Sequence, residues 1–264
     1  MSMSELRPPV IVGLALGALG LLIGPAAAAF AVVPGPSFFD GFDSLSAGRW
    51  YVSDGWSNGP HQNCGWSKQE ISVSGGMLNV GFSKNPAADN RIYRCGELRT
   101  QSFYSYGTYE ARLKTPAGSG LNAAFFSYIG GPGAPAHDEI DFEVLLKDTG
   151  KVQTGGFANN KGIPDDMPAL PKPSNSDFID YAFVWAPGSL KYYVDGKLVH
   201  SITDPAQVQT LPQRIYFSLW GSDTLTDWMG PFTDPGTIKM QVDWVAYTAP
   251  GEKCLFPQSI TCSQ

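Results

Sequence analysis

Residues 137–144 read His-Asp-Glu-Ile-Asp-Phe-Glu-Val, and from Glu139 onward acidic and apolar residues alternate strictly. Successive side chains of a β-strand point to opposite faces, so a strand places Glu139, Asp141 and Glu143 on one face and their apolar neighbours on the core face. A helix would set Glu139 against Glu143 as repelling i,i+4 neighbours and leave Phe142 outside the apolar stripe. The pattern therefore predicts a strand that presents three carboxyls together.

The same alternation recurs elsewhere in short runs that end at Gly, Pro, Asn or Asp. These runs are 70–73, 77–80, 107–113, 190–194 and 238–244. Asp195-Gly196 is typical of a hairpin turn, and no run of ten or more residues has helical periodicity. Many short strands at this spacing predict an all-β fold, either a β-sandwich or a barrel. Segment 155–177, rich in Gly, Pro, Asn and Asp, is interpreted as a long surface loop that walls a cleft.

Three carboxyls on one strand face indicate acid–base chemistry. At a rise of roughly 3.3 Å per residue the α-carbons of Glu139 and Glu143 stand about 13 Å apart, and twist with two reaching side chains brings their carboxyls to about 5 to 6 Å. Retaining glycosidases hold their carboxyls about 5 to 5.5 Å apart, and inverting enzymes about 6.5 to 9.5 Å. The charge of Asp141 is expected to raise the pKa of a neighbour. The alternative is a solvated acidic face, but no Lys or Arg is interleaved to offset the repulsion.

Composition sets the domain organisation and the class of partner. The 264 residues show no linker, which predicts one catalytic domain over 32–264. Segment 1–31 has an apolar run followed by small residues and is interpreted as a cleaved secretory signal, the alternative being an uncleaved membrane anchor. A net charge of −6 argues against nucleic acid or an anionic membrane as partner, but it leaves an acidic polysaccharide open. We expect a secreted monomer with no membrane contact after signal cleavage.

Four cysteines fit an exported protein, because disulfides persist in oxidising compartments. Sequence alone allows three pairings. We favour Cys64 with Cys95, which brackets the strands around 71–82, and Cys254 with Cys262, which closes the C-terminal tail. Four free thiols are the alternative, and a metal site is disfavoured because no short paired Cys spacing has a neighbouring His.

The acidic strand and its surroundings resemble glycoside hydrolase family 16. Glu139-Ile-Asp-Phe-Glu143 is similar to the family's Glu-x-Asp-x-Glu signature, and the resemblance runs from about 38 to 247, nearest to bacterial lichenases and rhizobial exopolysaccharide endo-β-glycanases. Further landmarks are Ser53-Asp54-Gly55-Trp56-Ser57-Asn58-Gly59, Cys95-Gly96-Glu97-Leu98-Arg99, Trp185-Ala186-Pro187-Gly188 and Asp243-Trp244-Val245. The resemblance implies a two-sheet antiparallel jelly-roll β-sandwich with a concave substrate cleft. It also implies that Glu139 is the nucleophile, Glu143 the general acid and then base, and Asp141 the assisting carboxylate.

By the same resemblance, a set of side chains matches positions that bind sugar in lichenases: Trp56, Asn58, Glu97, Arg99, Tyr128, Trp220 and Trp228. His137 stands where lichenases carry Trp, and Gly155, Phe157 and Ser218 replace Asn, Tyr and Asn, so we expect a substituted or decorated glucan. His137 is also similar to the residue that xyloglucan transglycosylases carry there. No extra residue precedes Glu143, which separates the chain from laminarinase-like and agarase-like members.

The resemblance implies no catalytic cofactor, but it does imply a structural calcium at Asp243, Gly41 and Gly76, the alternative being an ordinary strand Asp. The expected activity is hydrolysis within β-1,4 or mixed β-1,3/β-1,4 glucan or a related bacterial exopolysaccharide. The alternatives are a xyloglucan-type transglycosylase, a non-catalytic glycan-binding module and a structural envelope protein. Both motif glutamates are present, which disfavours the binding module.

Overall fold

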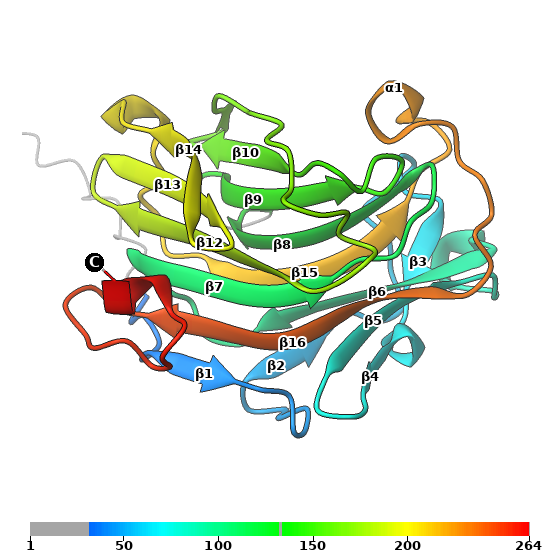
Figure 1. The fold of residues 1–264 in the computed structure, drawn as a ribbon. Coiled ribbons are helices and arrows are strands. Elements are labelled where there is room, and N and C mark those ends of the chain that lie inside the picture. The colour runs from blue at the N-terminus through cyan, green and yellow to red at the C-terminus, as the bar shows by residue number, and fades with distance from the viewer. Residues whose placement is uncertain (1–31, 132–133, 264) are drawn as a thin grey trace, which may run out of the picture. The chain divides into compact units, whose positions relative to one another are not determined.

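The computed structural model describes residues 32–131 and 134–263, and its regular structure is almost entirely β (Figure 1). The helical segments are the single turn α1 (Thr226–Met229) and the 3-10 turns Lys68–Glu70, Ala88–Asn90, Pro205–Gln207 and Ile260–Ser263. The predicted signal, 1–31, lies outside the described residues. Within the part of the chain that is described, no helix is long and apolar enough to cross a membrane.

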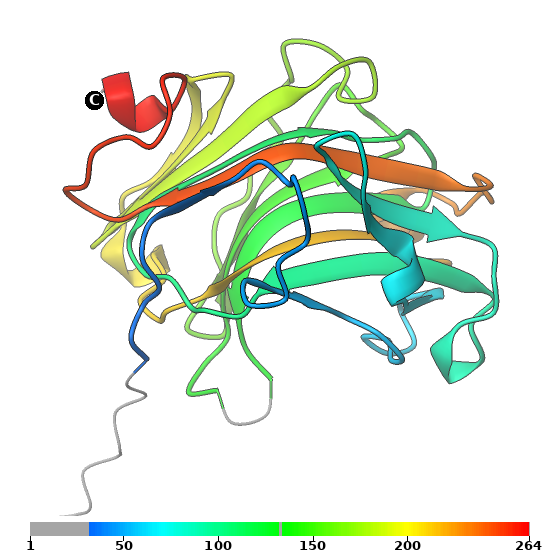
Figure 2. The ribbon, with the colours of Figure 1, turned by 90° about the horizontal axis from the view of Figure 1, so that it is seen from below.

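The strands form two layers, and β6, which belongs to the first layer, pairs with β5 of the second. The first, which we call the groove sheet, has the order β11 (Lys161–Gly162), β10 (Gln153–Ala158), β9 (Asp138–Leu145), β8 (Leu121–Ile129), β15 (Arg214–Gly221), β6 (Tyr93–Thr100) and β2 (Trp50–Val52). The second, the outer sheet, has the order β4 (Ile71–Val73), β5 (Leu78–Ser83), β16 (Ile238–Thr248), β7 (Gly107–Lys114), β12 (Ile179–Ala186), β13 (Ser189–Val194) and β14 (Lys197–Ile202). Strand β1 (Phe38–Asp40) pairs with β16, and β3 (Cys64–Trp66) pairs with β6. Figure 2 shows the long strands bent into a curved surface.

The layers enclose a core of aromatic side chains. Phe142 of the groove sheet lies 5.2 Å, between ring centroids, from Tyr192 of the outer sheet, and Phe125 lies 5.7 Å from Phe183. All four side chains are almost fully buried. The alternation in 139–144 therefore has its expected physical cause, since Ile140, Phe142 and Val144 are all buried. The antiparallel sandwich is confirmed, with one difference: β3 runs parallel to β6.

Two turn predictions have different outcomes. The hairpin at Asp195-Gly196 is confirmed, because both residues have positive φ, 46° and 74°, and join β13 to β14. The loop predicted over 155–177 is wrong at its start, since β10 continues to Ala158 and turns into β11. Glycine and asparagine there supply the backbone conformations of a strand edge and a tight turn, with Asn159 and Asn160 at positive φ.

Both predicted disulfides form, Cys64–Cys95 and Cys254–Cys262. The first ties β3 to β6 beside the groove sheet. The second closes the C-terminal tail, which a buried acid holds in place: Glu110 of β7 accepts hydrogen bonds from the Ser259 hydroxyl at 2.5 Å and the Ile260 N–H at 2.9 Å. Burial raises the pKa of Glu110, although these donors oppose that shift.

Candidate active site

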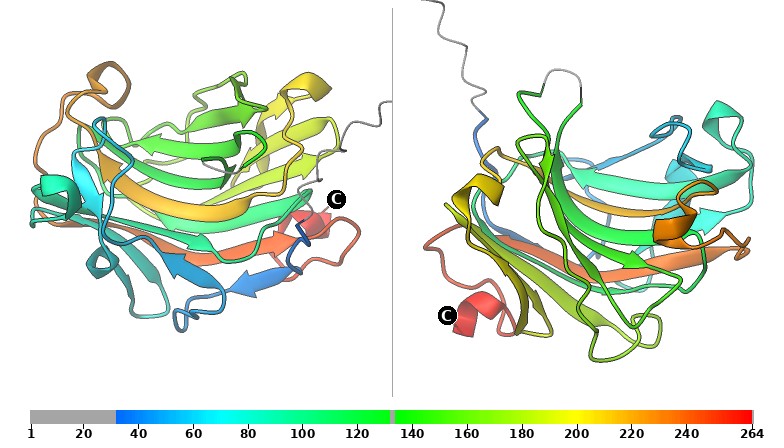
Figure 3. Two further views of the ribbon diagram at one scale, coloured as in Figure 1. Left: turned by 180° about the vertical axis from the view of Figure 1, so that it is seen from behind. Right: turned by 90° about the horizontal axis from the view of Figure 1, so that it is seen from above.

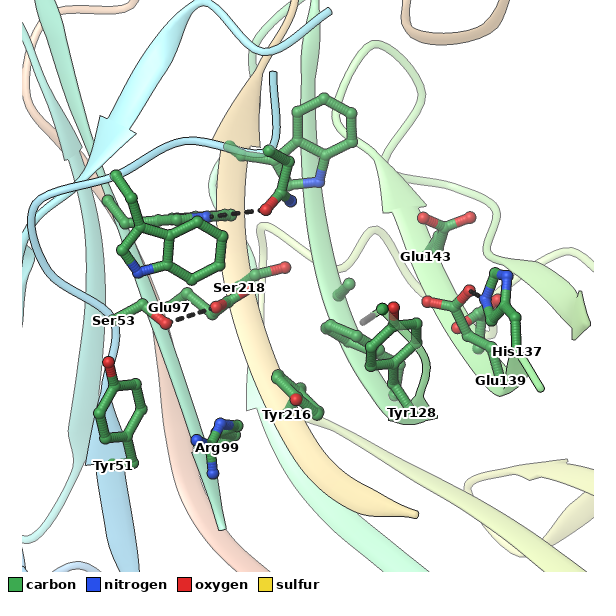
Figure 4. A pocket seen from close by; sticks show the side chains of 18 of the residues that line it. Tyr51, Ser53, Glu97, Arg99, Tyr128, His137, Glu139, Glu143, Tyr216 and Ser218 are labelled. Carbon is green, nitrogen blue, oxygen red and sulfur yellow. Dashed lines mark hydrogen bonds and ion pairs between the residues drawn. The ribbon is translucent and has the colours of Figure 1, made fainter. Parts of the chain in front are cut away.

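The three acids of β9 project into one cavity. Glu139, Asp141 and Glu143 all line a groove of about 720 Å³ on the open face of the groove sheet (Figure 4). Strand β9 is hydrogen-bonded along its length to β8 on one side and to β10 on the other. Figure 3 shows this group of curved strands from two further directions. The predicted strand, its single acidic face and its position in a concave cleft are therefore observed.

Burial raises the pKa values of two of the three acids, Asp141 and Glu143. Burial, followed by the charge of Glu139, raises the pKa of Glu143 to about 7, while a hydrogen bond from Asn122 opposes the rise. Burial and the charges of both glutamates raise the pKa of Asp141 well above its usual value. We expected the charge of Asp141 to perturb its neighbours. Desolvation is instead the first cause, and the pKa of Asp141 is itself raised.

Glu139 is held from several directions. Nε2–H of His137 donates to its carboxylate oxygen Oε2 at 2.7 Å, and the side chains are 31% and 19% exposed, respectively. The His137 ring stacks on Phe157 at 4.3 Å with 22° between the planes. Phe157 lies directly across from Glu139 in the β9–β10 ladder. The amide of Gln209 donates to the backbone carbonyl of Glu139 at 2.6 Å.

The approach of β10 to the acidic strand requires a glycine. Gly156 has φ of 135°, and a Cβ added there would lie 2.1 Å from the carbonyl oxygen of Glu139 and 3.2 Å from an Asp141 carboxylate oxygen. Any side chain at this position would push the strands apart. Glycine at position 156 thus lets β10 pack closely beside the acids of β9.

Sequence reasoning missed Asn122, which contacts the predicted acid directly. This fully buried side chain on β8 donates from Nδ2 to Glu143 Oε1 at 2.7 Å. The signal was present in the sequence, because Asn122 shares the face of Ala124, Phe126 and Tyr128 in a mostly apolar strand. A polar residue at a buried strand position needs a hydrogen-bond partner.

The groove continues from the acids across β8, β15 and β6 in cross-strand rows. One row is Glu143, Ala124, Ser218 and Glu97, and the next is Asp141, Phe126, Tyr216, Arg99 and Tyr51. Glu97 is only 6% exposed and accepts from the Ser53 hydroxyl at 2.6 Å. Burial raises its pKa to about 7, while Ser53 and Arg99 oppose the rise.

Seven of the eight predicted sugar-binding residues line this groove: Trp56, Asn58, Glu97, Arg99, Tyr128, His137 and Trp220. Trp228 does not; it packs 6.1 Å from Trp220, and its Nε1 donates to Gln153. Trp56 is 40% exposed, which leaves a large aromatic face for a ligand. The lining residues that sequence reasoning missed are Tyr51, Ser53, His61, Trp66, Ala124, Phe126, Gly131 and Tyr216.

The positions that depart from the lichenase pattern gather around the acids. Gly155 and Phe157 of β10 lie across from Asp141 and Glu139, and Ser218 lies in the row of Glu143. Two of the three altered positions therefore lie on the strand next to the acids, and the third, Ser218, lies two strands away in the same row as Glu143.

The predicted calcium ligands lie on the outer sheet and its turns. Asp243 sits at a bulge of β16, and its carboxylate is 3.3 Å from the Arg112 guanidinium. Gly41 follows β1, and Gly76 lies in the turn between β4 and β5. Within 32–131 and 134–263 no group of three or more His, Cys, Asp or Glu side chains is arranged to hold a metal. The Asp243 carboxylate already faces the Arg112 guanidinium, and the structural calcium stays a prediction.

Comparison with known proteins gives consistent matches. The family model for glycosyl hydrolases family 16 matches residues 58–246. The endo-1,3-1,4-beta-glycanase ExoK of Rhizobium meliloti (strain 1021) is 50% identical over 226 residues, which are 86% of this chain and 84% of that protein. The beta-glucanase of Bacillus subtilis (strain 168) is 36% identical over 81% of this chain and 87% of its own. The solved Bacillus licheniformis beta-glucanase matches with a TM-score of 0.77 at 33% identity, covering 81% of this chain and 99% of that one.

Proposed function

This chain belongs to glycosyl hydrolase family 16 and is a glycosidase of the lichenase type, and from this premise we propose that it is a secreted, monomeric, retaining endo-β-glycanase. Its substrate is a β-1,4 or mixed β-1,3/β-1,4 glucan, or a related bacterial exopolysaccharide. The observation that carries the proposal is the strand β9, whose three carboxyls share one groove and of which Asp141 and Glu143 have pKa values raised by burial. Secretion is supported by the two disulfides.

In the first chemical step, the ionised Glu139 attacks the anomeric carbon while Glu143 gives its proton to the departing glycosidic oxygen. Burial keeps Glu143 protonated near neutral pH, as a general acid requires. The raised pKa of Asp141, caused first by burial, disfavours a further negative charge beside the nucleophile. In the second step, Glu143 accepts a proton from water, the water attacks the glycosyl-enzyme ester, and Glu139 leaves as a carboxylate.

The stereochemical test is direct. Proton NMR taken during hydrolysis of barley glucan should show the β-anomer of the new reducing end first, with the α-anomer arising only by mutarotation. A panel of lichenan, xyloglucan, laminarin and succinoglycan, with products sized by mass spectrometry, defines the substrate. A labelled oligosaccharide acceptor that becomes longer would instead favour the transglycosylase, which the position of His137 supports. No oligosaccharide release from any glucan would refute the proposed hydrolysis.

The pH profile should show the titration of Glu143. We expect kcat/KM to fall as pH rises through about 7, because the general acid then loses the proton that it must donate. Glu97, whose pKa is also raised to about 7, lies in the same groove. The variant Glu97→Gln distinguishes Glu143 from Glu97 as the titrating acid. The alkaline limb of its pH profile, the fall in kcat/KM above about pH 7, should persist, although its KM changes. Loss of the limb in this variant would assign it to Glu97 instead.

His137 is expected to position the nucleophile through its hydrogen bond rather than through its ring. His137→Phe keeps a ring on Phe157 but removes the donor to Glu139, and we expect kcat to fall roughly 10- to 100-fold, the range of one hydrogen bond to a charged group. His137→Gln keeps a donor and should retain most of kcat, with a larger change in KM. If His137→Gln lost more kcat than His137→Phe, the stacking on Phe157 rather than the hydrogen bond would position the nucleophile.

A further inference from the structure

Two arginines lie side by side at one end of the groove. Arg99 of β6 is directly opposite Tyr216 of β15, and Arg214 comes two residues before Tyr216 on the same face of that strand. The arginines are therefore diagonal neighbours on adjacent antiparallel strands, within reach of a common ligand for side chains of this length. Arg99 lines the groove with Tyr51 and Tyr216, as Figure 4 shows. Arg214 lies opposite the groove-lining Tyr128 in the ladder between β15 and β8.

Both guanidinium groups lie over aromatic rings. The Arg99 guanidinium carbon is 4.4 Å from the centroid of the Tyr51 ring, and that of Arg214 is 3.7 Å from the centroid of Phe103. Each group donates one hydrogen bond to a backbone carbonyl, Arg99 to Thr100 at 3.1 Å and Arg214 to Gln101 at 3.3 Å. Since a guanidinium carries five N–H donors, most remain available to a ligand. The rings fix the orientation of both groups before a ligand arrives.

Over residues 32–131 and 134–263, the two arginines have no acidic ion-pair partner, because no carboxylate lies within ion-pair distance of either one. Burial and then the charge of Arg99 lower the pKa of Arg214, so the two groups repel each other. Glu97 interacts with Arg99, but its pKa is raised to about 7 and it is only partly ionised at neutral pH. Two adjacent cations with only a partly ionised carboxylate nearby are unfavourable, and the rest of the chain has an excess of acids.

The arginines are set apart from the reacting bond. Arg214 falls in the cross-strand row of Tyr128 and Glu139 and is two strands away from Glu139, which is about 10 Å at the usual strand spacing. Phe126 and Tyr216, stacked at 4.8 Å, form an apolar floor between the acids of β9 and the arginines. A sugar chain that lies across this floor would bring a neighbouring unit, not the cleaved one, to the two cations.

We propose that Arg99 and Arg214 form a subsite for a carboxylate carried by the β-glycan, so that the protein binds an acidic glycan in preference to its neutral counterpart. The planar guanidinium groups match a carboxylate by paired N–H donors, and a neutral hydroxyl would leave both charges uncompensated. This inference rests on the proposed function, because it needs a β-glycan in the groove. The carboxylate belongs either to a uronosyl unit of the chain or to an acidic substituent.

Binding measurements test the subsite without relying on turnover. The Glu139→Gln variant is titrated calorimetrically with short mixed-linkage β-gluco-oligosaccharides in three forms: oxidised at C6 to uronosyl units, carboxymethylated, and the C6-oxidised material reduced back to alcohols. We expect at least one acidic form to bind about 10-fold more tightly than the reduced form at low salt, with the difference shrinking at high salt. The form that gains affinity identifies where the carboxylate is carried.

Adding Arg214→Gln should remove that preference while leaving the affinity for the reduced form unchanged, and Arg214→Lys should keep part of it. Lys239→Gln, an exposed lysine on β16, is the matched loss of one positive charge and should change nothing. Equal affinity for acidic and reduced forms, no binding of any form, or equal weakening of all forms by Arg214→Gln would overturn the subsite. Failure of the wild-type protein to hydrolyse glucan, with the charge preference intact, would refute only the proposed function.

Discussion

Glu139→Ala should abolish glycan hydrolysis, lowering kcat on the order of 10⁴- to 10⁶-fold, as removal of a covalent nucleophile does. The side chain lines the groove, and the neighbouring Asp141 is a poor replacement because it is buried and its pKa is raised. Steady-state release of reducing ends from barley glucan measures the loss. Glu252→Ala, which removes an exposed acid from a C-terminal turn, is the matched control and should be fully active.

Azide separates a lost nucleophile from a damaged fold. In Glu139→Ala the vacated space admits azide, which attacks the anomeric carbon of an activated aryl glycoside from the nucleophile's side and gives an α-glycosyl azide, with net inversion. The midpoint of thermal unfolding should stay close to that of the parent protein. Residual hydrolysis at the parent rate would contradict the assignment of Glu139, whatever the azide result.

Glu143→Ala should lower kcat/KM for glucan about 10²- to 10⁴-fold, the usual contribution of a general acid. A substrate whose leaving group needs no proton, such as a dinitrophenyl glycoside, should still glycosylate Glu139 rapidly. The second step then lacks its base, so a burst of dinitrophenolate followed by a slow steady rate is expected. Azide should speed that slow rate and yield a β-glycosyl azide, with retained configuration.

Asn122→Ala distinguishes the acid from its support. It removes the hydrogen bond to Glu143 without removing the acid, so its deficit on glucan should be much smaller than that of Glu143→Ala. A Glu143→Ala variant that treats both substrate types alike, with no burst, would show that Glu143 is not the proton donor.

The sequence predicted the strand that carries the acids because two physical requirements coincide there. Ile140, Phe142 and Val144 must be buried, and three like charges must share the other face, which only a period of two satisfies. The hairpin at Asp195-Gly196 was equally predictable, since its backbone needs positive φ at both residues.

Contacts across the groove were harder to predict from the sequence, because they depend on the register between strands far apart in the chain. Nothing local to Asn122 says that it faces Glu143, and nothing local to Arg214 says that it adjoins Arg99. Trp228 illustrates the opposite error: its motif position suggested a sugar contact, yet α1 directs its indole N–H to Gln153. The raised pKa of Asp141 also depends on burial, which the alternation of residues in the sequence does not reveal.

Strand β9 is bonded to a neighbour along both edges, and Gly156 lets β10 lie against it without a gap. A backbone clamped in this way has almost no freedom to shift its side chains toward a bound ligand. The spacing between Glu139 and Glu143 is thus set by the paired backbone of β9. We therefore expect a bound pyranose ring to adapt its shape to this spacing more than the protein closes around the ring.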